Sequence, residues 1–180
     1  MSQLVKFGFI LGIICLAATL VLAVTYEVTK PRIEAQLKTE EEDALKAILP
    51  GADSFNAKTV DGIEYFEAVK GADLIGYCIR VVGDGYGGNI RMLVGIDPGG
   101  VIKGVEVLEQ YETPGLGARI SEILPGEKEP WFLKQFKGKQ AAAVEVKKNI
   151  DAITGATISS KAVTNAIRNT ISGFLAKVKK

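Results

Sequence analysis

Asp151-Ala-Ile-Thr-Gly-Ala-Thr-Ile-Ser-Ser160 opens the last periodic segment of the chain. From Ile158 to Val178, apolar residues recur at intervals of three and four, which predicts an amphipathic helix with one buried face. The start of this helix is rich in hydroxyl side chains: Thr154, Thr157, Ser159 and Ser160. Free backbone N–H groups and the positive end of the helix dipole favour a bound anion at such a position. The stretch therefore indicates a phosphate site.

A second interpretation of the same stretch needs no ligand. Ser and Thr are preferred N-cap residues, Gly155-Ala156 gives a tight turn into the helix, and Asp151 adds favourable charge near its start. Residue types alone leave both interpretations open, an ordinary capped helix and an anion site.

The exact string carries more information than its residue types. Asp-x-x-(Ser/Thr)-Gly-Ala-Thr resembles the flavinylation motif of the FMN-binding family that includes RnfG of the Rnf electron-transport complexes and NqrC of the sodium-pumping quinone reductases. In that family, the last Thr carries FMN through a phosphoester bond, which a dedicated transferase makes from FAD. The resemblance implies Thr157 as the acceptor, and four further positions match the motif: Asp151, Thr154, Gly155 and Ala156. We expect Thr154 and Ser159 to donate hydrogen bonds to the phosphate.

The composition limits the chemistry that the side chains can perform. The 180 residues carry a formal net charge of +1, so neither a nucleic-acid footprint nor an acidic tail is present. Without His, the chain cannot form Ser-His or Cys-His nucleophile pairs, His-ligated zinc or an axial-His haem. Cys15 and Cys78 cannot build a disulfide framework or an iron–sulfur cluster. Redox chemistry therefore needs a bound organic cofactor.

The N-terminal part of the chain is a hydrophobic segment. Phe7 to Tyr26 contains no charged residue and is long enough to cross a hydrocarbon core of about 30 Å. A secretory signal peptide is the competing interpretation, because Lys6 is a short positive region and Leu22-Ala23-Val24 ends in small residues. The segment exceeds the usual length of a signal core and lacks an evident Ala-x-Ala site, which favours a retained single-span anchor.

The basic residues hardly decide the orientation of this span, since Lys6 precedes it and Lys30 and Arg32 follow it. A very short N-terminal side suggests a cytoplasmic N-terminus, and the resemblance implies the same. We therefore expect the domain on the extracytoplasmic or periplasmic side of the inner (cytoplasmic) membrane. The uncharged span offers no relay for protons or sodium, so an ion path would belong to other subunits.

A helical connector is expected between the membrane and the domain. Pro31 is suited to the first turn of a helix, and an approximate helical period runs from Ile33 to Leu49. The acidic run Glu40-Glu41-Glu42-Asp43 is more typical of a solvated face than of a metal site. The expected division is 1–26 for the cytoplasmic tip and anchor, 27–51 for the connector and 52–180 for the FMN-binding domain.

Short β-type segments with glycine-rich turns fill the first part of the domain, residues 55–110. The cluster Gly83-Asp84-Gly85-Tyr86-Gly87-Gly88 lacks the Gly-Lys-(Ser/Thr) ending of a nucleotide phosphate loop, which favours a hairpin turn. Asp97-Pro98-Gly99-Gly100 predicts a tight hairpin. Together they indicate an antiparallel meander of four apolar or alternating strands: Tyr65–Val69, Leu74–Val82, Ile90–Ile96 and Val101–Leu108.

A second distinctive stretch, Glu112-Thr113-Pro114-Gly115-Leu116-Gly117, follows the last of these strands. By its residue types it is a Pro-Gly turn. It also resembles the Glu-Thr-Pro-Gly-Leu-Gly loop of the same flavoprotein family, which lies close to the isoalloxazine ring. The resemblance extends from about Gly76 to Phe174 and implies that four residues of this loop bind the cofactor: Glu112, Thr113, Leu116 and Gly117.

The expected fold is α+β, a single N-terminal transmembrane helix followed by an FMN-binding domain with an antiparallel sheet and a C-terminal helix. The resemblance implies a covalent FMN flavoprotein that relays electrons within an Rnf-type ferredoxin:NAD oxidoreductase, as an electron-transfer subunit and not a stand-alone catalyst. Its partners would be the other subunits of the complex and, during maturation, a flavin transferase. Two alternatives are a cofactor-free structural or binding module and the flavin subunit of a related quinone-reducing or extracellular electron-transfer system.

Overall fold

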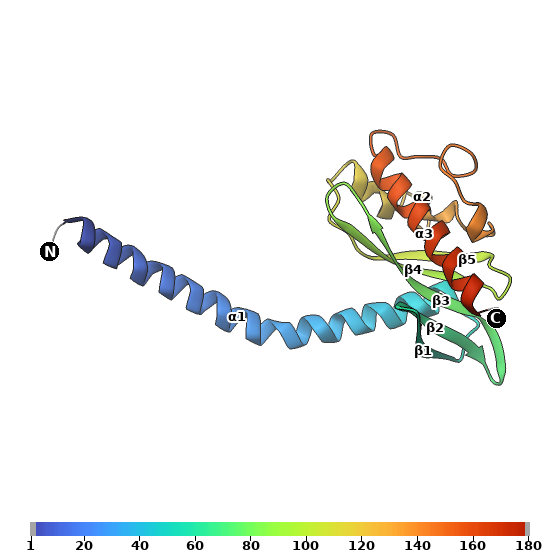
Figure 1. Ribbon diagram of the computed structural model, residues 1–180, viewed down its shortest axis with the longest axis horizontal. Helices are drawn as coiled ribbons and strands as arrows, with labels where there is room; N and C mark the ends of the chain where they lie inside the picture. Colours follow the sequence, from blue (N-terminus) through green and yellow to red (C-terminus); the bar gives the residue numbers. More distant parts are fainter. Residues whose placement is uncertain (1–2, 179–180) are drawn as a thin grey trace. The chain divides into compact units, whose positions relative to one another are not determined.

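The computed structural model describes residues 3–178. The chain divides into two compact units, Met1–Glu41 and Glu42–Lys180. A single helix, α1 (Gln3–Ile48), makes up the described part of the first unit and continues into the second (Figure 1). The second unit begins at Glu42 and so includes the end of α1.

Within residues 3–41, α1 has mostly exposed side chains, and the helix is long and apolar enough to cross a membrane. Pro31 lies inside α1, so the expectation that it begins a new helix is wrong. A proline within a helix removes one backbone hydrogen bond and clashes with the preceding turn, but strong helix formers on both sides can carry the helix through it. Glu27 and Lys30 before Pro31, and Ala35 and Leu37 after it, are such residues.

The second unit is built on a five-stranded antiparallel sheet in which each strand pairs with the next along the chain. The strands are β1 (Ser54–Val60), β2 (Ile63–Lys70), β3 (Asp73–Asp84), β4 (Asn89–Ile96) and β5 (Ile102–Glu109). The predicted meander is therefore confirmed, and β1 adds a mostly exposed edge strand that the sequence pattern did not mark. The Asp97 hairpin forms as expected, because its Oδ1 accepts hydrogen bonds from the N–H groups of Gly99 and Val101.

Both faces of the sheet are covered. The last turn of α1 packs Ala44, Leu45 and Ile48 on one face, against Cys78 and Leu93 of β3 and β4. Helix α3 (Thr157–Val178) crosses the strands and covers the other face (Figure 1). Its buried stripe confirms the amphipathic helix predicted from the sequence and consists of Val163, Ile167, Ile171 and Phe174.

Between β5 and α3 the chain is largely irregular. It contains η1 (Gly117–Ser121), α2 (Trp131–Lys134) and η2 (Ala141–Ala143). Fully buried side chains, among them Phe132 and Phe136, hold this segment on the sheet, and the N–H of Gly138 donates to the carbonyl of Ile102 in β5. This packing brings the Glu112–Gly117 loop to the start of α3.

Candidate functional site

The α3 cavity, about 360 Å³ in volume, lies where the first turn of α3 meets the Glu112–Gly117 loop and the glycine-rich turn between β3 and β4. It combines segments that are far apart in the sequence. Its lining residues are Tyr86, Glu112, Thr113, Leu116, Gly117, Gly155, Ala156, Thr157, Ile158 and Ser159.

Thr157 is the first residue of α3, and its side chain is exposed. The N–H of Ser160 donates to the carbonyl of Ala156 at 3.0 Å and so begins the backbone bonding of the helix. The three N–H groups ahead of it, from Thr157 to Ser159, have no preceding carbonyl within the helix. Together with the helix dipole, these donors make the start of α3 favourable for an anion beside the Thr157 hydroxyl.

The turn into α3 depends on Gly155 and Ser160. Gly155 has a φ of +81°, a conformation that costs glycine little and other residues more. The buried Ser160 hydroxyl donates to the carbonyl of Ala156 at 2.9 Å and accepts from the N–H of Ile153 at 3.0 Å. Ser160 therefore fixes the 153–156 turn from within and does not line the cavity.

The opposite wall is the Glu112–Gly117 loop. The carbonyl of Thr113 accepts hydrogen bonds from the N–H groups of Leu116 at 3.1 Å and Ala118 at 3.2 Å, which closes the turn predicted from Pro114-Gly115. Gly115 has a φ of +77°. The turn leaves Leu116 46% exposed at the cavity, where a Cβ on Gly155 would lie 3.1 Å from the Leu116 Cδ2.

Glu112 joins three segments of the site. Its side chain is only 6% exposed. One carboxylate oxygen accepts from the N–H of Gly87 at 2.9 Å, and the other accepts from the hydroxyl of Ser159 at 2.5 Å. The Ser159 proton is thus directed to Glu112, whereas the sequence led us to expect Ser159 as a donor to a phosphate.

Eight of the ten residues singled out from the sequence line the α3 cavity; Asp151 and Thr154 do not. Asp151 is exposed, and its backbone exchanges two hydrogen bonds with the side chain of Gln135. Thr154 is also exposed. Sequence reasoning missed Tyr86 and Ile158 as lining residues. For Tyr86 the available signals were its position within the glycine cluster and the likeness of Gly85–Gly88 to the same family, and for Ile158 its position next to Thr157.

The residues of the α3 cavity fit FMN. The helix start and the Thr157 hydroxyl suit a phosphate, and three side chains leave large apolar surfaces that a flat ring could cover: Tyr86, Leu116 and Ile158, which are 73%, 46% and 56% exposed. The glycine turn allows close backbone approach on one side, since a Cβ on Gly87 would lie 2.1 Å from the carbonyl oxygen of Tyr111.

Replacing Gly87 by Ala is expected to lower the free energy of unfolding by about 2–3 kcal/mol, because the added methyl meets backbone atoms of Tyr111 that cannot move cheaply. Gly173→Ala is the matched control. Gly173 lies within α3 with no atom within 4 Å of its added Cβ, so this change is expected to stabilise by about 0.5–1 kcal/mol. Urea unfolding followed by circular dichroism measures both, and equal effects would contradict the close approach at Gly87.

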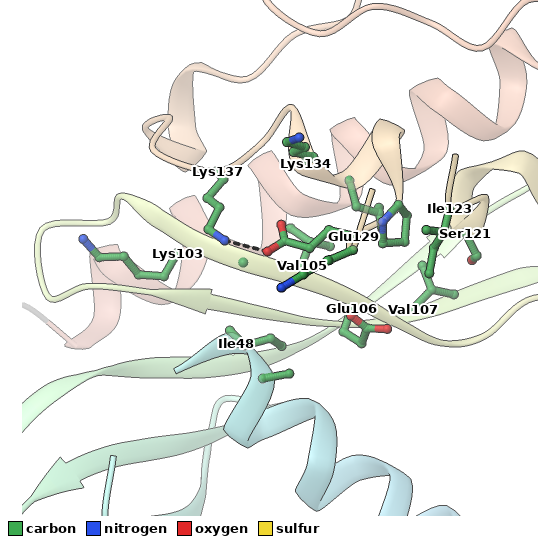
Figure 2. Close-up of a pocket in the computed structure, with 15 residues that line it drawn as sticks. Ile48, Lys103, Val105, Glu106, Val107, Ser121, Ile123, Glu129, Lys134 and Lys137 are labelled. Atoms are coloured by element: carbon green, nitrogen blue, oxygen red, sulfur yellow. Dashed lines mark hydrogen bonds and ion pairs between the residues drawn. The ribbon is translucent and has the colours of Figure 1, made fainter. Parts of the chain in front are cut away.

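A second hollow, the β5 cavity, measures about 240 Å³ and contains none of the ten predicted residues. It lies between β5, the end of α1 and the segment around α2 (Figure 2). Its lysines are largely engaged: Lys137 pairs with Glu129 at 2.9 Å, and Lys103 pairs with Asp97 at 3.0 Å. Glu106 lines the same cavity, where burial and then the negative charge of Glu129 raise the pKa of its carboxyl above the ordinary 4.5.

Because the pKa of the Glu106 carboxyl is raised, replacing Glu106 by Gln is expected to stabilise the protein at neutral pH. A raised carboxyl pKa means that the folded protein holds the proton more tightly than the unfolded chain. Glu106 therefore favours folding below about pH 4.5 and loses that contribution as the pH rises through the raised pKa. The variant should gain up to about 0.5 kcal/mol at pH 7 and nothing at pH 4. Unfolding curves at the two pH values test this, and a gain that is equal at both would contradict the charge argument.

The described side chains offer little redox or metal chemistry of their own. Among residues 3–178, no group of three or more His, Cys, Asp and Glu is placed to hold a metal ion. Cys78 is fully buried, and burial raises the pKa of its thiol to about 12, so it is unreactive at neutral pH. Cys15 lies in the apolar part of α1.

The helix-backed antiparallel sheet and the family comparison together place this protein in the class of FMN-binding domains. The family model of the FMN-binding domain matches residues 85–172, and that of the RnfG N-terminal region matches residues 1–48. The subunit named C of the Na(+)-translocating NADH-quinone reductase from Parabacteroides distasonis has a similar fold, with a TM-score of 0.50 and 29% identity over 63% of this chain and 61% of that one.

Relatives that are named as subunits of a complex match this chain over most of their own length. The subunit named G of the proton-translocating ferredoxin:NAD(+) oxidoreductase complex of Clostridium ljungdahlii is 35% identical, over 89% of this chain and 86% of the relative. Its counterpart, also named G, in the Na(+)-translocating ferredoxin:NAD(+) oxidoreductase complex of Acetobacterium woodii is 31% identical, over 92% and 89%. The chain belongs to the RnfG family of the ion-translocating Rnf oxidoreductase complexes.

Proposed function

We propose that this protein is a membrane-anchored flavoprotein subunit that carries FMN on Thr157 and relays electrons within an Rnf-type ferredoxin:NAD oxidoreductase complex. The observation that carries the proposal is the α3 cavity. It brings Gly155, Ala156 and Thr157 together with residues of the Glu112–Gly117 loop, and these two stretches were recognised separately in the sequence. Thr157 is exposed there at the start of a helix.

Each wall of the cavity has a distinct part in this function. The N–H groups at the start of α3 hold the phosphate, and the Thr157 hydroxyl is the point of attachment. Tyr86, Leu116 and Ile158 provide apolar surface for the ring. Bound FMN would supply redox chemistry that no side chain of the chain provides.

Covalent attachment is supported by the placement of Thr157. The hydroxyl is exposed at the cavity, so a flavin transferase could reach it in the folded domain. Attachment also suits a domain on the extracytoplasmic side of the membrane, where lost FMN could not readily be replaced.

The transported ion belongs to other subunits in this proposal. The two relatives above are named for different ions, protons and Na(+), although their identity to this chain is similar. Moreover, no charged residue lies between Phe7 and Tyr26, so the span has no group that could relay a proton or coordinate sodium electrostatically. The other membrane and peripheral subunits of the complex are therefore required partners.

Intact mass measurement of the full-length protein, co-expressed with a flavin transferase and exported, tests the proposal. The expected result is an added mass of about 438 Da, the FMN-phosphoryl group, together with flavin fluorescence in a denaturing gel. Peptide mapping should place the adduct on the peptide that contains Thr157. An unmodified protein, with the transferase active on a control substrate, would replace this proposal with a cofactor-free structural module.

A further inference from the structure

Glu112 is the only Asp, Glu, Lys or Arg among the residues that line the α3 cavity. The remaining lining residues are neutral: glycines, hydroxyl residues, Ala156 and the apolar or aromatic side chains of Leu116, Ile158 and Tyr86. A ligand in this cavity therefore lies beside one carboxyl group, that of Glu112, and beside no positively charged side chain of the lining.

The surroundings of Glu112 hold its charge in place without neutralising it. Both carboxylate oxygens accept hydrogen bonds from uncharged donors, the Gly87 N–H and the Ser159 hydroxyl. A hydrogen-bond donor facing each oxygen suits an ionised carboxylate, which can only accept. Within residues 3–178, no Lys or Arg forms an ion pair with it.

Close packing fixes the position of the carboxylate as well. A Cβ on Gly85 would lie 2.1 Å from one Glu112 oxygen, and a Cβ on Gly117 would lie 2.2 Å from the other. At 6% exposure, little water reaches the group to screen it. Its field therefore acts on the cavity through a medium less polar than bulk water.

We infer that Glu112 lowers the reduction potential of the flavin in this cavity, and that Ser159 and Gly87 are positioning groups that hold its carboxylate against the cavity wall. The inference rests on the proposed function. Each electron added to the flavin brings one unit of negative charge unless a proton accompanies it. A fixed carboxylate beside the cavity raises the energy of that added charge, so reduction requires a stronger donor.

Spectroelectrochemical titration of the full-length flavin-loaded protein in detergent tests this inference through two substitutions of the same residue. Glu112→Gln removes the charge and keeps the length of the side chain. Glu112→Asp keeps the charge and shortens the side chain. The potential should shift to a more positive value in the Gln variant and stay close to that of the unmodified sequence in the Asp variant, even where the Asp variant unfolds at a lower temperature.

Glu109→Gln is the control for charge removal in general. Glu109 lies three residues before Glu112, its side chain is 37% exposed, and it pairs with Arg91 outside the α3 cavity. Solvent and salt screen such a group, so its removal should leave the potential unchanged. A similar positive shift in both the Glu109 and the Glu112 variants would overturn a specific role for Glu112.

Other outcomes separate this inference from the proposed function. A loaded Glu112→Gln variant with an unshifted potential overturns the inference alone, as does a shift of equal size in the Asp variant, which would be an effect of geometry. A folded Gln variant that holds no flavin would assign Glu112 to cofactor retention instead. If the Gln variant does not fold, a positive shift in the Asp variant still overturns the inference, and an unshifted value supports it. An unloaded parent protein would overturn the proposed function and this inference with it.

Discussion

Thr157→Ala should abolish the covalent flavin completely while leaving the domain folded. The hydroxyl oxygen of Thr157 is the attachment atom in the proposed function, and Ala has no atom that could form the phosphoester. The residue is exposed and begins α3, where Ala is well tolerated. The free energy of unfolding of the flavin-free protein should therefore change by less than about 0.5 kcal/mol. Intact mass and in-gel flavin fluorescence give the first result, and urea unfolding gives the second.

Two matched variants make this result specific. Thr157→Ser keeps a hydroxyl at the same position, so an adduct should form on it. Thr170→Ala removes a hydroxyl from the same helix at a residue outside the α3 cavity and should leave the adduct intact. An adduct that persists in Thr157→Ala would move the attachment to another hydroxyl, with Ser159, Thr154 and Ser160 as the nearest in sequence. Loss of the adduct in all three variants would point to a general defect in maturation.

The fold could be predicted from the sequence because it depends on local patterns, and Thr157 was proposed as the attachment residue from a local pattern as well. The spacing of apolar residues after Ile158 marked α3, and the Asp97 hairpin follows from its Pro-Gly-Gly turn. Apolar or alternating runs of residues predicted four of the five strands. Strand β1 was not predicted, because its residues are mostly exposed and show little apolar alternation. Thr157 and the Glu112–Gly117 loop were each recognised within a short contiguous stretch.

The internal organisation of the site could not be predicted in the same way. The hydrogen bond between Ser159 and Glu112 joins residues 47 positions apart, and no local pattern specifies that pairing. From the sequence, Ser159 was equally suited to a phosphate, and Glu112 was placed near the ring by resemblance only. Gly87 was interpreted as part of a turn, whereas its close approach to Tyr111 depends on how that turn packs on another segment. The prediction that Pro31 begins a helix failed for the opposite reason. The local preference of proline for the first turn was overridden by the helix formers around it.

Phe174→Ala should lower the free energy of unfolding of the second unit by about 3–5 kcal/mol, the cost of truncating a fully buried aromatic side chain. The Phe174 ring lies 4.8 Å from that of Tyr65 and 5.2 Å from that of Tyr77, both in edge-to-face geometry. The substitution therefore removes the contacts by which the end of α3 packs on β2 and β3. Thermal unfolding should show a midpoint lower by more than about 10 °C. Phe174→Leu, which keeps most of the volume, should cost less than half as much.

The same variant separates stability from cofactor chemistry. At about 1.5 Å per residue, Phe174 lies roughly 25 Å along α3 from Thr157, so the two residues share no contact. Below its unfolding midpoint, Phe174→Ala should therefore carry the full flavin adduct at an unshifted potential, whereas Thr157→Ala should lose the adduct and keep its stability. If Phe174→Ala instead lost flavin while still folded, the start of α3 could not be an independently formed site. The anion-binding geometry would then depend on how the whole helix packs, and not on its first turn.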